Sequence, residues 1–418
     1  MTEGRFGFIN KRSLAWALYD CGNSAFALST LAVLFPLFLG SFWSAGAEGA
    51  VVTARLAWTT AAASFVVLIL SPVLGAIADS GGFRKRFLFS LGMVGAISTV
   101  MLGVVPEGQW QYALLAFFFG SIGFYSANVF YDSLIFEVST PKNYDLVSAL
   151  GFSVGYVGSA LLLTLQVGMI TAPASFGFES VAPVIRIAFV TVGVWWFVFM
   201  LPLMLIVPEP AARASDGAKS VVAAYQSLVD TFQHIRRYRK IIVFLLAYTL
   251  YIAGVFTAIF MAVNFGQRLG FEQTDLVMAL LVTNFAGFPA TLAYGWLGHR
   301  VGPKRALYLG LAVYVAVAIW AVFLEFVWQF YVMAVLVGTV QGGVQAMSRS
   351  LFASLIPPDQ SAEFFGFYNM LTKLAHVLGP FVVGIGTMIS DDPKAILIAL
   401  LPLYVAGALV LTRVDERS

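Results

Sequence analysis

The sequence carries little charge. Only 11% of its 418 residues are charged, whereas 60% are hydrophobic and the mean hydropathy is +0.87. Soluble domains have a charged fraction of roughly a quarter. A soluble chain of this length could not bury so much apolar surface. We therefore expect an integral membrane protein, with lipid as the solvent for most of the chain.

Cysteine and histidine are scarce as well. Cys21 is the single cysteine, which excludes an internal disulfide, and the three histidines lie on separate segments. The sequence has no nucleotide-binding loop, metal-ligand cluster or nucleophile triad, so we expect neither an enzyme nor a cofactor. The net charge of +3 is too small to suggest a nucleic-acid partner.

Long apolar runs fill the sequence instead. Because about 20 apolar residues cross a bilayer, the runs predict twelve spans: 14–40, 53–79, 86–105, 109–136, 145–171, 184–207, 241–267, 275–297, 303–324, 328–356, 361–389 and 393–412. One long polar segment separates the sixth span from the seventh. We expect a six-helix bundle over 1–207, a linker over 208–240 and a second six-helix bundle over 241–418.

The linker has a helical pattern of its own. Its apolar residues recur at steps of three or four, which predicts an amphipathic helix on the membrane surface: Val221, Tyr225, Leu228, Phe232 and Ile235.

The cations predict the orientation in the membrane. If both termini are cytoplasmic, 19 of the 24 lysines and arginines fall in cytoplasmic segments, four fall outside and Lys373 falls within a span. Cytoplasmic loops carry an excess of Lys and Arg. We therefore expect both termini in the cytoplasm.

Two loops repeat. GAIADSGGFRKR begins at Gly75 and GWLGHRVGPKRA begins at Gly295, 220 residues later, each between the second and third spans of its half. Anchoring at the headgroups alone would explain the basic residues of these loops but not the spacing of the glycines around the aspartate. The alignment pairs Asp79 with His299, Arg84 with Lys304, and Lys85 with Arg305.

Twelve spans, a central linker and this repeated loop resemble the major facilitator superfamily of transporters. The resemblance implies an all-α membrane protein of two six-helix bundles related by a pseudo-two-fold axis. It also implies that the loops gate the cytoplasmic side, which makes five residues candidates: Asp79, Arg84, Lys85, Lys304 and Arg305.

Ionisable residues within the predicted spans are rare and therefore mark candidate functional positions. The first half supplies two carboxylates, Asp20 and Asp132, and the second supplies two cations, Arg349 and Lys373. Further polar candidates share helices with these residues or face them: Asn23, Asn128, Asn264, Gln341, Gln345, Asn369 and His376.

Three interpretations of these charges stay open. The carboxylates pair with Arg349 or Lys373 across the two halves and close the cytoplasmic side. Alternatively, the carboxylates bind an ammonium or a proton while a basic residue binds a carboxylate. In the third interpretation, each charge satisfies a nearby helix end. Lys373, near the predicted midplane, is the first candidate for contact with substrate.

Three segments narrow the resemblance: ALYDCGNSAFAL from Ala17, YDSLIFEVSTPKNYDLVSALGFSVGYVGSAL from Tyr131, and QGGVQAMSRSLFASLIPPDQSAEFFGFYNMLTKLAHVLGP from Gln341. They are similar to the vacuole-effluxer family, the autophagy-related branch of the superfamily. A fungal member is associated with amino-acid efflux from the vacuole. The resemblance thus implies a secondary transporter of a small organic solute, with an amino acid or similar zwitterion as substrate.

Further expectations concern the mechanism, the coupling ion and the membrane. Alternating access is the expected mechanism, and protons are the candidate coupling ion. Transport of a lipid or lipid precursor by the same fold is the alternative. The compact loops point to a bacterial inner membrane, and we expect a monomer.

Overall fold

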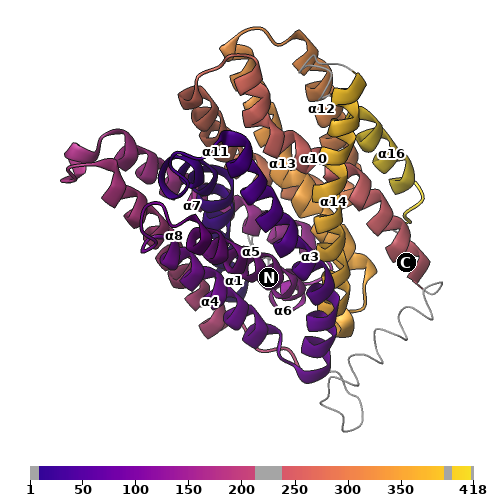
Figure 1. Cartoon of the computed structure of the whole chain (residues 1–418). Coiled ribbons are helices and arrows are strands. Elements are labelled where there is room, and N and C mark those ends of the chain that lie inside the picture. Colours follow the sequence, from indigo (N-terminus) through magenta and orange to yellow (C-terminus); the bar gives the residue numbers. More distant parts are fainter. Residues whose placement is uncertain (1–8, 212–237, 390–397, 416–418) are drawn as a thin grey trace.

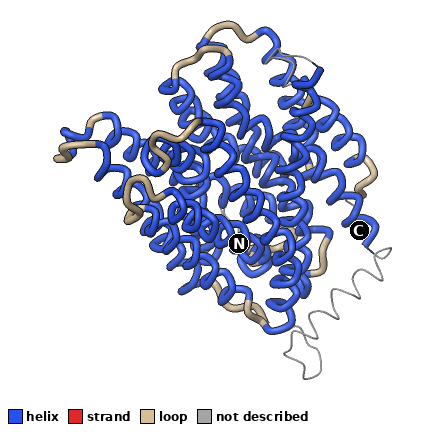
Figure 2. Tube along the Cα trace, viewed as in Figure 1, coloured by secondary structure: helices blue, strands red, loops and turns tan. Residues whose placement is uncertain are grey.

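The computed structural model describes residues 9–211, 238–389 and 398–415, and within them the chain forms helices and loops without strands (Figure 2). The first helical run comprises α1 (Lys11–Ala25), η1 (Phe26–Leu34), α2 (Phe35–Phe38) and η2 (Leu39–Trp43). The rest of the first half comprises α3 (Gly49–Gly81), α4 (Arg84–Leu102), α5 (Trp110–Ser133), α6 (Ile135–Val138), α7 (Tyr144–Thr171), η3 (Pro173–Phe176) and α8 (Val181–Ile206).

The second half begins after residues 212–237, which lie outside the described ranges. It comprises α10 (Arg239–Arg268), α11 (Gln273–Val301), α12 (Pro303–Trp320), η5 (Ala321–Phe323), α13 (Val327–Leu355), η6 (Pro358–Gln360), α14 (Ser361–Ile389) and α16 (Leu401–Leu411).

These helices occupy the predicted spans. Among the described residues, ten helices are long and apolar enough to cross a membrane. In addition, α14 fills the predicted eleventh span and α16 fills the described part of the twelfth. The predicted linker helix lies on residues 212–237, outside the described residues. Residues 390–397, which include the start of the predicted twelfth span, also lie outside them.

The first span contains a feature that the sequence did not predict. Two of its stretches, η1 and η2, are π-helical and flank the short α2 segment that contains Pro36. A π-helical turn holds one more residue than an α-helical turn and often occurs at functional positions. The N-terminal part of this span, which contains Asp20, is therefore α-helical, whereas its C-terminal part is largely π-helical.

The two halves of the chain lie side by side (Figure 1). Helices of the first half, coloured indigo to magenta, meet the orange and yellow helices of the second half along two lines. On one line α3 and α5 pack against α14, and on the other α7 packs against α11 and α13. These lines are where side chains of the two halves can touch.

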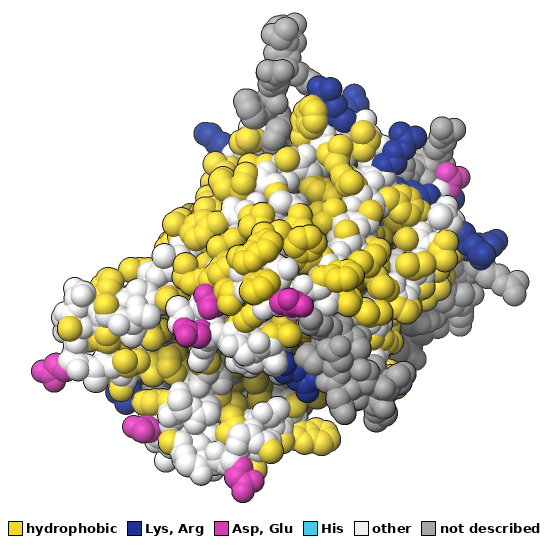
Figure 3. Space-filling view, turned by 90° about the horizontal axis from the view of Figure 1, so that it is seen from above, with side chains coloured by type: hydrophobic (Ala, Val, Ile, Leu, Met, Phe, Trp, Pro, Cys, Tyr) yellow, Lys and Arg dark blue, Asp and Glu magenta, His cyan; other side chains and the backbone are white. Residues whose placement is uncertain are grey.

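The outer surface is apolar. A broad band of hydrophobic side chains covers the face in Figure 3, and charged side chains lie mainly at its margins. Large apolar residues such as Trp58, Phe65 and Leu205 are exposed. This pattern is expected of helices solvated by lipid.

Glycines allow α3 and α14 to approach closely. A Cβ at Gly75 would lie 2.2 Å from the backbone oxygen of Ala362, and a Cβ at Gly366 would lie 2.6 Å from the backbone oxygen of Ser71. Each helix therefore presents a glycine to the backbone of the other, a packing mode common between membrane helices.

We expect Gly75→Ala to destabilise the protein by about 1–3 kcal/mol, the usual cost of overpacking, because a backbone carbonyl blocks the new methyl group. Gly49→Ala on the same helix is the control, since no atom lies within 4 Å of a Cβ there. Thermal unfolding of purified protein measures both. Equal midpoints for the two variants would contradict the close approach.

Candidate functional site

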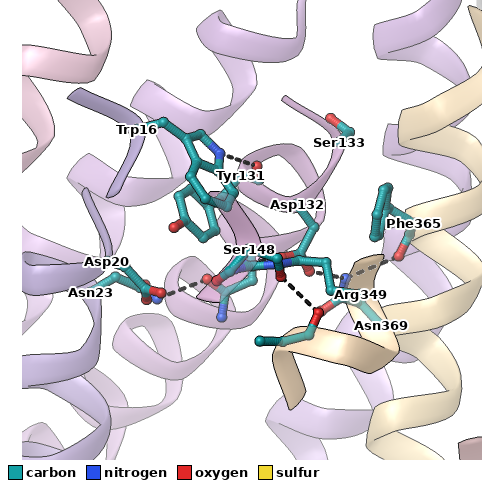
Figure 4. A network of polar contacts seen from close by, with 12 residues as sticks. Trp16, Asp20, Asn23, Tyr131, Asp132, Ser133, Ser148, Arg349, Phe365 and Asn369 are labelled. Atoms are coloured by element: carbon teal, nitrogen blue, oxygen red, sulfur yellow. Dashed lines mark hydrogen bonds and ion pairs between the residues drawn. The ribbon is translucent and has the colours of Figure 1, made fainter. Parts of the chain in front are cut away.

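A buried guanidinium, that of Arg349 on α13, joins the two halves (Figure 4). Its Nη1 donates to Asp132 Oδ1 on α5 at 3.0 Å and forms an ion pair. Its Nε donates to Ser148 Oγ at 2.9 Å, and its Nη2 donates to the Ser148 backbone oxygen at 2.8 Å on α7. The side chain is only 2% exposed, and all three of its nitrogens bind the first half.

Aromatic rings surround the same guanidinium. Its Cζ lies 4.3 Å from the ring centroid of Phe152, 4.7 Å from that of Trp16 and 5.4 Å from that of Tyr131. Trp16 stacks on Tyr131 and donates its indole N–H to the Tyr131 backbone oxygen at 2.9 Å. Ring faces attract cations, more strongly where water is excluded. The rings therefore help to hold the charge in a fixed place.

The second oxygen of Asp132 binds another helix of the second half. Asn369 Nδ2 on α14 donates to Asp132 Oδ2 at 3.1 Å and to the Phe365 backbone oxygen at 3.0 Å. Asp132 thus joins α5 to both α13 and α14. Near it, Ser350 on α13 donates a hydrogen bond to Asp145 on α7.

Asp20 lies near this network but is not paired with it. The side chain is 4% exposed, and its Oδ1 accepts a hydrogen bond from Ser24 at 3.1 Å. No ion pair within 4 Å joins Asp20 to any cation in the described parts of the chain. One turn away, Asn23 Nδ2 donates to Asn128 Oδ1 at 2.9 Å, which joins α1 to α5.

Lys373 on α14 is placed differently from Arg349. Its ammonium lies over the ring of Tyr125 on α5 and 3.5 Å from His376 Nδ1. The charges in the sequence made Lys373 a candidate partner of Asp20 or Asp132, but the structure pairs it with neither carboxylate. It is 3% exposed, so the contact with Tyr125 is buried between the halves.

The remaining polar candidates are Gln345, Gln341 and Asn264, which belong to the second half. Gln345 Nε2 donates to Tyr156 OH on α7 at 3.2 Å and to the Gln341 backbone oxygen at 3.3 Å. Gln341 also lines an apolar cavity of about 50 Å³ among α10, α11, α12 and α13. Asn264 lies on α10, and its side chain is outside the description.

A second charged contact lies where α14 begins. Asp79 accepts from Arg84 Nε at 2.6 Å and from the backbone N–H groups of Ala362 and Glu363 at 3.2 and 2.8 Å. Arg84 also donates to the backbone oxygens of η6. A carboxylate at a helix N-terminus satisfies free N–H groups and the helix dipole. Asp79 and Arg84 therefore tie the first half to the start of α14.

Lys85 and Lys304, two other basic residues of the repeated loops, bind within their own halves of the chain. Lys85 donates to the backbone oxygens of Met204 and Val207 at the end of α8, and Lys304 donates to those of Thr412 and Val414 at the end of α16. Each lysine thus caps the last helix of its own half.

This placement corrects the alignment of the two loops. Lys304 plays the part of Lys85 rather than of Arg84, because the second loop is one residue shorter. Arg84 follows Gly82 and Phe83, whereas α12 begins directly after Gly302. Arg305 is exposed, and His299, in the position of Asp79, is exposed too.

The sequence pattern did not predict three residues that contribute to this site: Ser148, Tyr125 and Tyr156. Serine and tyrosine are ordinary within membrane helices, so their residue types gave no signal. Ser148 binds Arg349 through both its hydroxyl and its backbone oxygen, and its position four residues after a helix start is equally unremarkable.

The fold defines the class of protein. The structure superposes on that of FucP, a major facilitator superfamily transporter in the outward conformation, with a TM-score of 0.73 over 98% of this chain and 99% of that one, at 14% identity. It superposes on the proton:xylose symporter XylE with a TM-score of 0.74, covering 98% of this chain and 96% of that one, also at 14% identity. The fold is therefore that of a major facilitator superfamily transporter. A family match and a relative in Bacillus subtilis place the chain in this superfamily, as an integral membrane transporter and not an enzyme.

The sequence defines the family within that class. The family model described as "Vacuole effluxer Atg22 like" matches residues 10–137 and 137–418, and the chain belongs to this family. The chain is 36% identical to the "Uncharacterized MFS-type transporter YxiO" of Bacillus subtilis (strain 168). The alignment covers 98% of this chain and 96% of that protein. The chain is 24% identical over 76% of its length to "Autophagy-related protein 22" of Coccidioides immitis (strain RS) and spans 64% of that protein.

We expect Asp132→Asn and Arg349→Gln each to destabilise the protein by roughly 3–5 kcal/mol, because each leaves a buried charge without its partner. The double variant should cost clearly less than the sum of the two. Arg305→Gln, at an exposed cation, is the control and should have little effect. A double-mutant cycle on thermal stability measures the coupling. Additive losses would mean that the two charges do not interact.

Proposed function

We propose that the chain is a secondary transporter that moves a small zwitterionic solute, first of all an amino acid, by alternating access. The observation that carries the proposal is the buried pair of Arg349 and Asp132, which joins the two halves through opposite charges. A contact of this kind can break and reform as the halves rock, because each partner belongs to a different bundle.

The contacts between Arg349 and Asp132 and between Asp79 and α14 form the gate in this proposal. Both lie at the end of the molecule formed by the α3–α4 loop and the start of α14, which we call the basic end. The excess of lysine and arginine at this end supports a cytoplasmic location with both termini inside. The state described here is then closed to the cytoplasm, and the membrane is the bacterial inner membrane.

The two six-helix bundles, 1–207 and 241–418, are the moving parts, joined by the linker. Lys85 and Lys304 support this division, because each fixes a loop to the last helix of its own bundle. Since one chain supplies both sides of the interface, a monomer is sufficient for transport.

The distribution of charge supports a zwitterion. The first half supplies Asp20 with Asn23 and Asn128 nearby, which suit an ammonium, and the second supplies Lys373, which suits a carboxylate. His376, Gln341 and Gln345 extend the polar lining in the second half in this proposal. These charged groups favour a polar solute over a lipid, so lipid transport is the weaker candidate.

Asp20 is the proposed site of a coupled proton. It is buried and has no ion-pair partner within 4 Å among the described residues. A carboxylate in this position can be neutralised by a proton or by the ammonium of a substrate, so the same residue can respond to both.

Transport by purified protein in liposomes tests the proposal. We expect wild-type protein to exchange at least one labelled amino acid across the membrane and to accumulate it when a pH gradient is imposed. Asp20→Asn should still exchange the amino acid, with lower affinity because the ammonium loses a carboxylate, but should lose the response to the gradient. Exchange needs only alternating access with substrate bound, whereas accumulation needs the proton.

Sugars, peptides and phospholipids are the comparison solutes in the same assay. Exchange of a lipid but of no amino acid would contradict the proposed substrate class. Exchange of an amino acid with an unaltered response to the gradient in Asp20→Asn would remove Asp20 from the coupling.

A further inference from the structure

Lys373 is a buried cation at the contact between the halves. It lies on α14 of the second half, 3% exposed, and its ammonium sits on the ring of Tyr125 on α5 of the first half. Asn369, which binds Asp132, lies one helical turn earlier on the same face of α14. The contact of Lys373 with Tyr125 is therefore the next link between the halves beyond Asp132.

The charge of this ammonium is not balanced by the residues around it. No ion pair within 4 Å joins it to a carboxylate in the described ranges. Asp132 is bound instead by Arg349 and Asn369, and Asp79 is bound at the start of α14. Its neighbours are the Tyr125 ring and His376 Nδ1. A ring face attracts a cation but compensates less than the loss of water costs.

The surroundings also restrict what an additional partner can be. Phe256 packs edge-on against His376 with ring centroids 4.5 Å apart. On this side the surroundings of Lys373 are therefore aromatic. A single ammonium is balanced by one negative charge, which a carboxylate supplies and a phosphate dianion exceeds. A small monoanion therefore matches this ammonium best.

We propose that Lys373 and Tyr125 form an exchangeable latch, in which the carboxylate of the transported solute takes the ammonium of Lys373 away from the Tyr125 ring. The inference rests on the proposed function and deepens it. Substrate then replaces one of the links between α5 and α14, and the gate is left with the contacts of Arg349, Asn369 and Asp79. Binding of the carboxylate favours opening of the basic end for that reason.

Three forms of one solute test the carboxylate requirement. Each labelled amino acid that exchanges is put in competition with itself, with the amine that lacks the carboxylate, and with the N-acetyl acid that lacks the ammonium. We expect the amine to compete at least tenfold more weakly than the amino acid with wild-type protein. In Lys373→Gln the amino acid should lose about tenfold in affinity, and its advantage over the amine should disappear.

Two controls accompany this comparison. Thr372→Val changes the neighbouring residue, which binds Tyr248 instead, and should preserve the advantage. Lys373→Met is a second variant with a similar chain length and should behave as Lys373→Gln does. An undiminished advantage of the amino acid over the amine in both Lys373 variants would overturn the proposal.

A cysteine reporter tests the latch itself. In a Cys21→Ser background, Ser361→Cys places a thiol where α14 begins, at a position that is fully buried beside Ser133. Tyr125→Leu should raise its rate of labelling severalfold without substrate, whereas Tyr125→Phe, which keeps the ring, should not. The amino acid should raise labelling with Lys373 present but not in Lys373→Gln.

The outcomes separate the two proposals. If no amino acid affects exchange or labelling of wild-type protein, the proposed function and the latch both fail. If amino acids affect wild-type protein and Lys373→Gln alike, the proposed function stands and the latch is overturned. Equal labelling of Tyr125→Leu and Tyr125→Phe would likewise overturn the latch.

Discussion

A guanidinium buried between two bundles of helices sets the main constraint on this structure. Such a charge is stable only if every nitrogen finds a partner, and Arg349 finds all of its hydrogen-bond partners on the opposite half of the chain. The halves must therefore lie at one particular distance and register while the pair is intact. Gly75 and Gly366 meet this requirement by allowing α3 and α14 to approach, and Asp79 fixes the start of α14 in the same register.

The same constraint makes the arrangement suitable for switching. A charged pair can exchange its protein partners for water or for a solute of matching charge, which an apolar contact cannot do. In the proposed mechanism, Asp132 and Arg349 hold the closed state, and Lys373 and Asp20 are the charges left for solute and proton. The acidic groups of one half and the basic groups of the other then serve both the gate and the substrate.

Much of this could be predicted from the sequence. Apolar run length predicted the spans, because one bilayer thickness governs them all, and the cost of burying charge marked Asp132 and Arg349 as candidates. What could not be predicted depends on how helices face one another. The contact of Lys373 with Tyr125, the part played by Ser148 and the equivalence of Lys85 with Lys304 follow from helix rotation and from a loop one residue shorter, which local periodicity does not encode. The π-helical stretches of the first span had no sequence signal that we recognised.

In the proposed mechanism, the pair of Arg349 and Asp132 holds the two halves together at the basic end. The most direct test is a distance distribution between spin labels at Lys142 and Ser354, which are exposed on the first and second halves at that end, measured by pulsed electron spin resonance in the Cys21→Ser background. We expect a short distance in otherwise unaltered protein and a second, longer population once Asp132→Asn is introduced. Identical distributions with and without Asp132→Asn would contradict it.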